Sequence, residues 1–180
     1  MILLLVILSG CAAEKPQEIA EDIRNNILNA EQITMTADIV ADYGSRAYQF
    51  RLRLVSKDEG WLIEVIKPEN ISGLTASVSA DSSSLEYDGV ILDTGYLNSM
   101  GLSPMNCLPT IINAWINGHV DEAIRYEDDG AALVSISYTV SDDTDVSTVF
   151  EEEKLLPQEA FISVDGYTVI SCHFGNVVIE

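Results

Sequence analysis

The sequence predicts a mainly β (α+β) protein: an open, curled antiparallel β-sheet, or half-barrel, of about 9–11 strands with an N-terminal helix and an inserted helical lid or plug. Two observations lead to this fold class. Apolar and polar residues alternate along most of the chain, and turn residues such as Asp-Gly separate the alternating runs. Two other segments repeat their apolar residues with helical spacing.

Length and composition indicate one folded, acidic domain. The chain has 180 residues, with 29 acidic and 9 basic side chains and a formal net charge of -20, yet 47% of its residues are hydrophobic. Disordered acidic segments are poor in apolar residues, so we expect the charge to coat a folded core. The same charge excludes nucleic acid as a partner, and it excludes docking on anionic lipids through basic residues.

The N-terminal residues are expected to lie outside the fold. The chain begins with an apolar run that is too short to span a bilayer. The run ends in Leu8, Ser9, Gly10 and Cys11, which resemble a bacterial lipobox, where signal peptidase reads the small residues and the cysteine is lipidated. We therefore predict a lipoprotein signal peptide at 1–10, a lipidated cysteine and tether at 11–17, and one domain at 18–180.

Lipidation at Cys11 would anchor the exported protein on the outer face of the bacterial cell membrane, since two acyl chains give stable anchoring. The alternative is an apolar first strand with a chance cysteine. Signal peptides begin with basic residues, and none precedes this apolar run. Whether Met1 is the true start therefore stays open.

The first element after the tether is expected to be an amphipathic helix from Pro16 to Ala30. Ile19, Ile23 and Ile27 recur every four residues, which places them on one face. Pro16 suits the first turn, where a helix has no use for its missing N–H group.

From Ile33 onward the apolar period becomes two, which predicts strands. Odd positions are apolar in 33–42, and even positions are apolar in 47–56 after a turn at 43–45. Asp88-Gly89 is a strong hairpin signal. The strands expected in this half are 33–42, 47–56, 60–67, 74–80, 85–87 and 90–92.

A second helix is expected from Pro104 to about Asn117, closed by Gly118. Pro109 lies inside this segment and should split it into a short turn and a helix proper. The strands expected after it are 122–126, 132–140, 146–152, 160–164 and 167–179.

The stretch Trp61–Glu69, a strand that ends in a proline, and the hairpin Leu85–Val90 resemble the LolA/LolB-like lipoprotein-localisation fold. The resemblance extends in element order over roughly 16–180. It implies an unclosed antiparallel barrel whose inserted helices cover a hydrophobic cavity that accepts acyl chains. With its lipobox, the chain is similar to the lipid-anchored members, including Gram-positive proteins of unknown function. Neither the carrier's gating arginine nor the lipidated receptor's protruding apolar loop maps onto a position here, so those roles do not transfer.

Large apolar residues are predicted to lie between the sheet and the helices. If helix and sheet close fully on each other, these residues form an ordinary core. If they do not, the residues line a cavity that would solvate an acyl chain at about 0.8 kcal/mol per buried methylene. The candidates are Phe50, Trp61, Ile63, Val65, Ile111, Trp115 and Phe174.

Cys107 and Cys172 remain as thiols if Cys11 is lipidated. Each lies on an apolar face, one in the second helix and one in the last strand, and both point into the same space if the helix lies in the barrel. A disulfide between them is one interpretation in an exported protein. Two buried free thiols are the more ordinary alternative.

The sequence predicts no catalytic residue, metal or cofactor. His119 follows the helix end and should be exposed, His173 opposes the apolar face of its strand, and neither has metal-ligand spacing. The acidic run 142–145 lacks the glycine and the later glutamate that a calcium-binding loop needs, so it is expected to be a solvated turn. Nucleophile-elbow and phosphate-binding glycine motifs are absent from the sequence.

We therefore expect a non-enzymatic, membrane-anchored extracytoplasmic lipoprotein that binds or carries a lipid, an acylated protein or another hydrophobic ligand. The alternative is a structural or assembly scaffold lipoprotein with a filled core that binds a protein partner. The ligand, the partner, the oligomeric state and the biological process are not given by the sequence.

Overall fold

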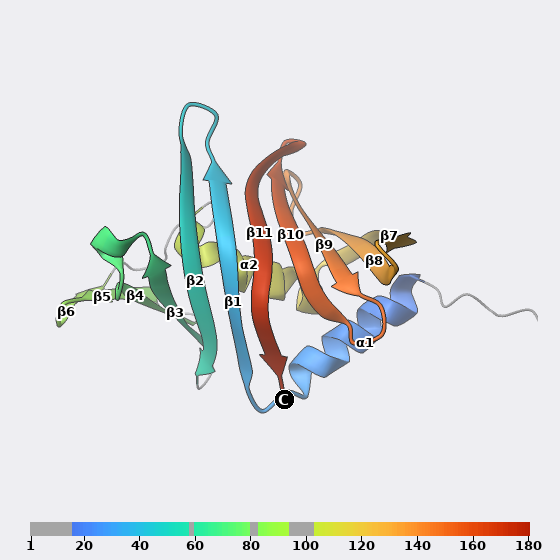
Figure 1. The fold of residues 1–180 in the computed structure, drawn as a ribbon, viewed down its shortest axis with the longest axis horizontal. Helices are drawn as coiled ribbons and strands as arrows, with labels where there is room; N and C mark the ends of the chain where they lie inside the picture. The colour runs from blue at the N-terminus through green and yellow to red at the C-terminus, as the bar shows by residue number, and fades with distance from the viewer. Residues whose placement is uncertain (1–15, 58–59, 80–82, 94–102) are drawn as a thin grey trace, which may run out of the picture.

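The computed structural model describes residues 16–57, 60–79, 83–93 and 103–180. Eleven strands of these residues form one antiparallel sheet in the order β6-β5-β4-β3-β2-β1-β11-β10-β9-β8-β7. The edge strands β6 and β7 lie at opposite ends of the molecule, so the sheet is open (Figure 1). The expected mainly β architecture with two helices is therefore confirmed.

The bounds of the elements agree with most of the expected ranges. The helices are α1 (Pro16–Leu28), the 3-10 helix η1 (Glu69–Ile71) and α2 (Pro104–Asn117). The strands are β1 (Ile33–Asp42), β2 (Ala47–Lys57), β3 (Gly60–Lys67), β4 (Thr75–Ser79), β5 (Ser83–Tyr87), β6 (Val90–Asp93), β7 (His119–Asp128), β8 (Ala131–Thr139), β9 (Thr144–Glu151), β10 (Leu156–Val164) and β11 (Tyr167–Ile179).

Strand β1 lies at the centre of the sheet, between β2 and the C-terminal strand β11. Its odd-numbered residues face the core, from Ile33 at 4% exposure to Ala41 at 0%. Its even-numbered residues Asp38, Val40 and Asp42 are exposed on the other face. The period of two therefore determines which face of the sheet is apolar, as expected for a strand with one solvated side. We call the apolar face concave and the solvated face convex.

Helix α1 packs on α2 and β7. Its isoleucines at positions 19, 23 and 27 are buried because a spacing of four places them on one side of the helix. Leu28, the last residue of the helix, is 59% exposed.

Helix α2 crosses the concave face and contacts β2, β4, β8 and β10 (Figure 1). The expected split at Pro109 is wrong, because α2 is continuous from Pro104 to Asn117. Proline removes the hydrogen bond to the Met105 carbonyl. Burial of Leu108, Pro109 and the apolar residues that follow against the sheet offsets that loss.

Gly118 ends α2 for a steric reason. Its φ of -65° is open to any residue, so the left-handed conformation is not what requires glycine here. A Cβ at this position would lie 2.5 Å from the Ala114 carbonyl oxygen and 3.0 Å from Tyr138 Cβ. The missing side chain therefore lets the helix end pass close to β8.

Strands β7 and β10 exceed their predicted ranges the most. Strand β7 begins at His119 because hairpin pairing with β8 continues through polar residues at the sheet edge. Strand β10 begins at Leu156, and a register shift between Pro157 and Glu159 accommodates the proline in its pairing with β9. Neither α1 nor α2, among the described residues, is long and apolar enough to cross a membrane.

Candidate functional site

The concave face has two regions that the helices cover unequally. We call the concave side of β8–β11 the covered wing and the concave side of β3–β6 the outer wing. In the covered wing, Val134, Ile136, Val146 and Ile162 are all 0% exposed. The sheet and α2 therefore close fully on each other there.

Trp115 of α2 lies at the centre of the covered wing. Its indole Nε1 donates a hydrogen bond of 2.9 Å to the hydroxyl oxygen of Thr148, which is itself fully buried. Its ring meets Phe150 edge-on at a centroid distance of 5.4 Å and Phe174 at 6.0 Å. The indole nitrogen therefore has a hydrogen-bond acceptor, and the indole ring packs against two other aromatic rings.

The outer wing presents apolar side chains in register across four strands. Trp61 pairs with Val78, and Ala76 pairs with both Ile63 and Leu85. Ile63 and Ala76 are fully buried, whereas Trp61, Val78 and Leu85 are only partly buried.

By strand alternation the same face continues to Tyr87 and its pairing partner Val90 at the sheet edge. These two side chains are 45% and 60% exposed. Exposure therefore increases away from α2. We name this surface, formed by Trp61, Val78, Leu85, Tyr87 and Val90, the outer apolar face.

All seven predicted cavity residues belong to one apolar cluster or pack against it, but they differ in how deeply they are buried. Four of them are fully buried, and the other three are partly buried and pack against the cluster. The first group is Ile63, Val65, Ile111 and Trp115, and the second is Phe50, Trp61 and Phe174. Whether they line a ligand site stays a prediction, and the surface that remains open is suited to apolar rather than polar groups.

One buried polar pair was not identified from the sequence. The Tyr138 hydroxyl on β8 is buried, and neither it nor the buried Nε of Arg24 on α1 has a hydrogen-bond partner within the described part of the chain. Burial raises the pKa of Tyr138, and the Arg24 charge lowers it by a smaller amount. The tyrosine therefore stays a neutral phenol under all ordinary conditions.

The convex face carries a row of charged residues that crosses five neighbouring strands. Pairing register aligns Glu159, His173, Asp38, Arg51 and Lys67, from β10 to β3. The Arg51 guanidinium donates two hydrogen bonds to the Asp38 carboxylate, at 2.8 and 2.6 Å, and His173 Nδ1 lies 3.0 Å from Glu159 Oε1. Four of these five residues border a hollow of about 540 Å³, with Glu159 outside it. The bond from Arg51 holds the pKa of Asp38 below its usual value.

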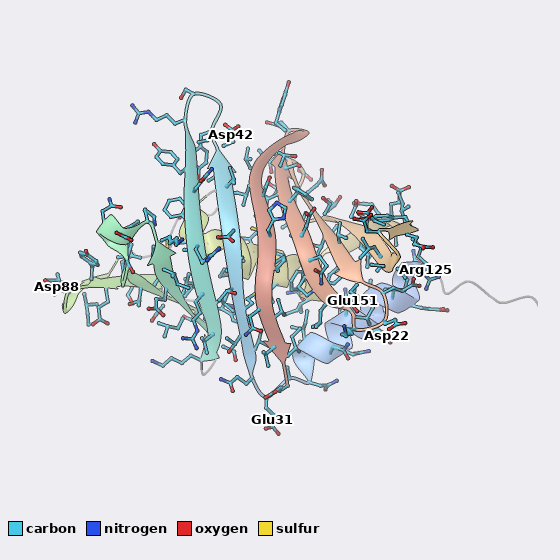
Figure 2. The ribbon with its side chains drawn as sticks, viewed as in Figure 1. Asp22, Glu31, Asp42, Asp88, Arg125 and Glu151 are labelled. Carbon is cyan, nitrogen blue, oxygen red and sulfur yellow. The ribbon has the colours of Figure 1, made fainter. Side chains whose placement is uncertain are left out.

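Charge is also unevenly divided along the chain. Residues 46–67 hold five of the nine basic residues and three acidic ones, a local charge of +2 that leaves -22 for the remainder. Figure 2 shows carboxylates such as Glu31, Asp42 and Asp88 pointing outward from separate ends of the molecule. The segment that contains β2 and β3 is therefore a basic stretch in an otherwise acidic chain.

The residues considered for metal or acid–base chemistry are solvated. His119 is exposed, and His173 lies on the convex face, as expected. Asp143 accepts hydrogen bonds from the Ser141 and Thr144 hydroxyls, which lower its pKa and order the acidic turn. Within the described ranges, no three His, Cys, Asp or Glu side chains are grouped so as to hold a metal ion.

Cys107 and Cys172 are both free and buried. Cys11 and the lipobox residues Leu8, Ser9 and Gly10 lie outside the described residues. The domain boundaries at 10 and 17 also stay predictions.

Comparisons with known proteins give structural matches without sequence matches. No family model matches the chain, and no curated protein sequence does. An outer membrane lipoprotein-sorting protein domain from Vibrio parahaemolyticus superposes with a TM-score of 0.56 at 10% identity, covering 92% of this chain and 94% of that one. The fold is LolA-like. A LolA superfamily protein from Nitrosomonas europaea matches with a TM-score of 0.51 at 12% identity, covering 93% and 94% of the two chains.

A DUF1329 family protein from Desulfovibrio piger also shares this LolA-like fold, with a TM-score of 0.52 at 11% identity and 92% coverage of both chains. At these identities the likeness establishes the architecture alone. It agrees with the resemblance found in the sequence, and any binding role has to be argued from this chain's own residues.

Proposed function

We propose that the protein is a lipid-anchored, extracytoplasmic binding module without enzymatic activity, and that it holds an amphiphilic ligand on the outer wing. The observation that carries this proposal is the outer apolar face: aromatic and aliphatic side chains, in register on the concave side, that the helices leave partly exposed. Contiguous exposed apolar surface on a folded protein marks an interaction site. A LolA-like fold is compatible with a lipoprotein-binding or carrier-like role.

The ligand class follows from the chemistry of the face. Trp61, Val78 and Leu85 offer carbon surface, so an acyl chain of a lipid or of an acylated protein fits better than a polar metabolite. Burying six methylenes would contribute roughly 5 kcal/mol, which corresponds to a Kd of a few hundred micromolar. A weak, reversible site of this kind suits a module that accepts and releases its ligand.

Anchoring at Cys11 is the second part of the proposal. Acyl chains on this residue would tether the domain, and the net charge of -20 would keep its surface away from anionic headgroups. Metabolic labelling with an alkyne fatty acid should mark the wild-type chain and not the Cys11→Ser variant. Equal labelling of both would refute lipidation at this residue.

Ligand binding is tested by native mass spectrometry of the 14–180 fragment, which retains every described residue. After delipidation, we expect it to take up a fatty acid or a phospholipid. Leu85→Glu places a charge on the outer apolar face and should abolish uptake. Ser84→Glu is the matched control, because it puts the same charge on the opposite face of the same strand. Absence of any uptake by the wild-type fragment would refute the carrier role.

The filled covered wing favours a second candidate, a scaffold lipoprotein whose helices complete its core. Trp115 and Ile111 are at most 1% exposed, so this half has no room for a ligand. The scaffold role predicts no lipid uptake and a protein partner recovered by crosslinking on intact cells. Uptake that is sensitive to Leu85→Glu would exclude it.

A further inference from the structure

We propose that Cys107 and Cys172 are a dithiol pair that an extracytoplasmic oxidant converts to a disulfide, fixing the first turn of α2 to β11. The inference rests on the proposed function only for the exported location, where disulfides form and persist. Ligand binding plays no part in it.

The two thiols approach from elements that are distant in sequence. Cys107 is in the first turn of α2, and Cys172 is in the middle of β11, paired with Ile39 on one side and Ala160 on the other. Both side chains are 0% exposed on the concave side. A bond between them would therefore join the inserted helix directly to the centre of the sheet.

The two thiols lie in the same apolar cluster beneath α2, where both are fully buried. The Cys107 thiol donates a hydrogen bond of 3.0 Å to the Pro104 carbonyl oxygen. Its pKa is raised first by burial and then by its interaction with Cys172. Cys172 is therefore the thiol partner that the fold offers to Cys107.

The first turn of α2 is weakly tied to the rest of the helix. Ser103 occupies the N-cap position, but its side chain makes no capping hydrogen bond. Pro109 has no N–H group to donate to the Met105 carbonyl oxygen, so one link between the first and second turns is missing. The first turn can consequently open while the remainder of α2 stays packed.

Such an opening is what the chemistry requires. Burial raises the pKa of the Cys107 thiol, so in the closed arrangement it is a poor nucleophile that solvent oxidants do not reach. When the first turn lifts, Cys107 becomes solvated and its thiolate fraction rises. The closed state thus protects the dithiol, and the transiently open state allows its oxidation.

The oxidant is a disulfide, either of a thiol oxidoreductase or of a low-molecular-weight thiol. The Cys107 thiolate attacks one sulfur of that disulfide, which releases one external thiol and leaves a mixed disulfide. Cys172 then attacks the Cys107 sulfur and expels the second external thiol. Two cysteines lose two electrons, the external disulfide gains them, and the two protons leave on the released thiols.

The test begins with the full-length protein extracted from bacterial membranes without reductant and alkylated with N-ethylmaleimide. Cys107 and Cys172 lie on different tryptic peptides, because Arg125 and Lys154 stand between them. We expect a cross-linked peptide pair that dithiothreitol separates. Oxidised protein should melt about 5–10 °C above the reduced protein, because a loop of this length is closed in the unfolded chain.

Cys172→Ala and Cys107→Ala are matched controls that keep a small apolar side chain at each position. In either variant the melting temperature should no longer depend on the redox state, and one folded variant is sufficient for the comparison. The proposal is overturned if both cysteines are recovered as maleimide adducts after incubation with oxidised glutathione in dilute urea. It is also overturned if the cross-linked and reduced chains melt together. Neither result bears on lipid uptake, so the proposed function is tested separately.

Discussion

The covered and outer wings are built from the same alternating strands, yet only one of them is closed. In the covered wing the central concave residues of β8, β9 and β10 are fully buried, and α2 packs on β8 and β10. In the outer wing exposure increases along the register from Ile63 at 0% to Val90 at 60%. The alternation of a strand therefore determines which face is apolar, whereas the position of one helix determines whether that face is solvated.

This difference assigns separate roles to the two wings. The covered wing contains the buried aromatic cluster around Trp115, so we expect it to contribute more to stability than the outer wing. The outer wing has apolar surface that no described helix fully covers, and it is where a ligand would be bound. Each prediction below tests this division by making a similar change in both places or by confining a change to one of them.

The largest effect is expected from truncating a tryptophan. Trp115→Ala should lower the free energy of unfolding by about 3–5 kcal/mol, because it opens a cavity beside Phe150 and leaves the Thr148 hydroxyl unpartnered. Trp61→Ala should cost less than half as much, since that side chain is already partly solvated. Urea denaturation monitored by circular dichroism gives both values. Equal losses in the two variants would mean that the wings do not differ in packing.

A smaller, local effect is expected from Gly60→Ala in the outer wing. The added Cβ would lie 2.4 Å from the Val78 carbonyl oxygen, so β3 and β4 must separate at that point. We expect faster amide hydrogen exchange in β4–β6 and unchanged exchange in β8–β10, with a loss of about 1–3 kcal/mol. Ser77→Ala, at an exposed position of β4, is the control. Faster exchange across the whole sheet would show that the outer wing does not open on its own.

The smallest effect concerns Asp38, where β1 joins the two wings on the convex face. Its pKa is lowered chiefly by the hydrogen bonds from Arg51, so its ionised form stabilises the folded state. This contribution is fully present above the unfolded pKa near 3.8 and is lost as the pH falls through the lower folded value. The melting temperature of the wild type should therefore fall more steeply below about pH 4 than that of Asp38→Asn. If the melting temperatures of the two proteins fall equally below about pH 4, the Asp38–Arg51 pair contributes nothing to stability.

Much of the fold could be predicted from periodicity, because burial of one face leaves a direct trace in sequence. The odd residues of β1 and the isoleucines of α1 are examples. Pro109 was misjudged because a rule for isolated helices ignores the burial that holds α2 against the sheet. Alternation also cannot show which strands are neighbours. The pairing of Asp38 with His173, 135 positions later, therefore emerged only from the register.

The sequence predicted which residues form the candidate site, but not how deeply each of them is buried. All seven apolar residues belong to one cluster, yet the sequence could not distinguish the filled part at Trp115 from the open part at Trp61. That distinction depends on where α2 crosses the sheet, which is a property of tertiary packing.

Photo-crosslinking with a diazirine-bearing fatty acid tests the central claim most directly, because it reports where the acyl chain lies. After illumination of the delipidated protein and peptide mapping, we expect label on β3–β5, at or beside Trp61, Val78 and Leu85. The covered-wing strands β8 and β9 should carry none. Label distributed over both wings, or confined to β8 and β9, would contradict the assignment of binding to the outer apolar face.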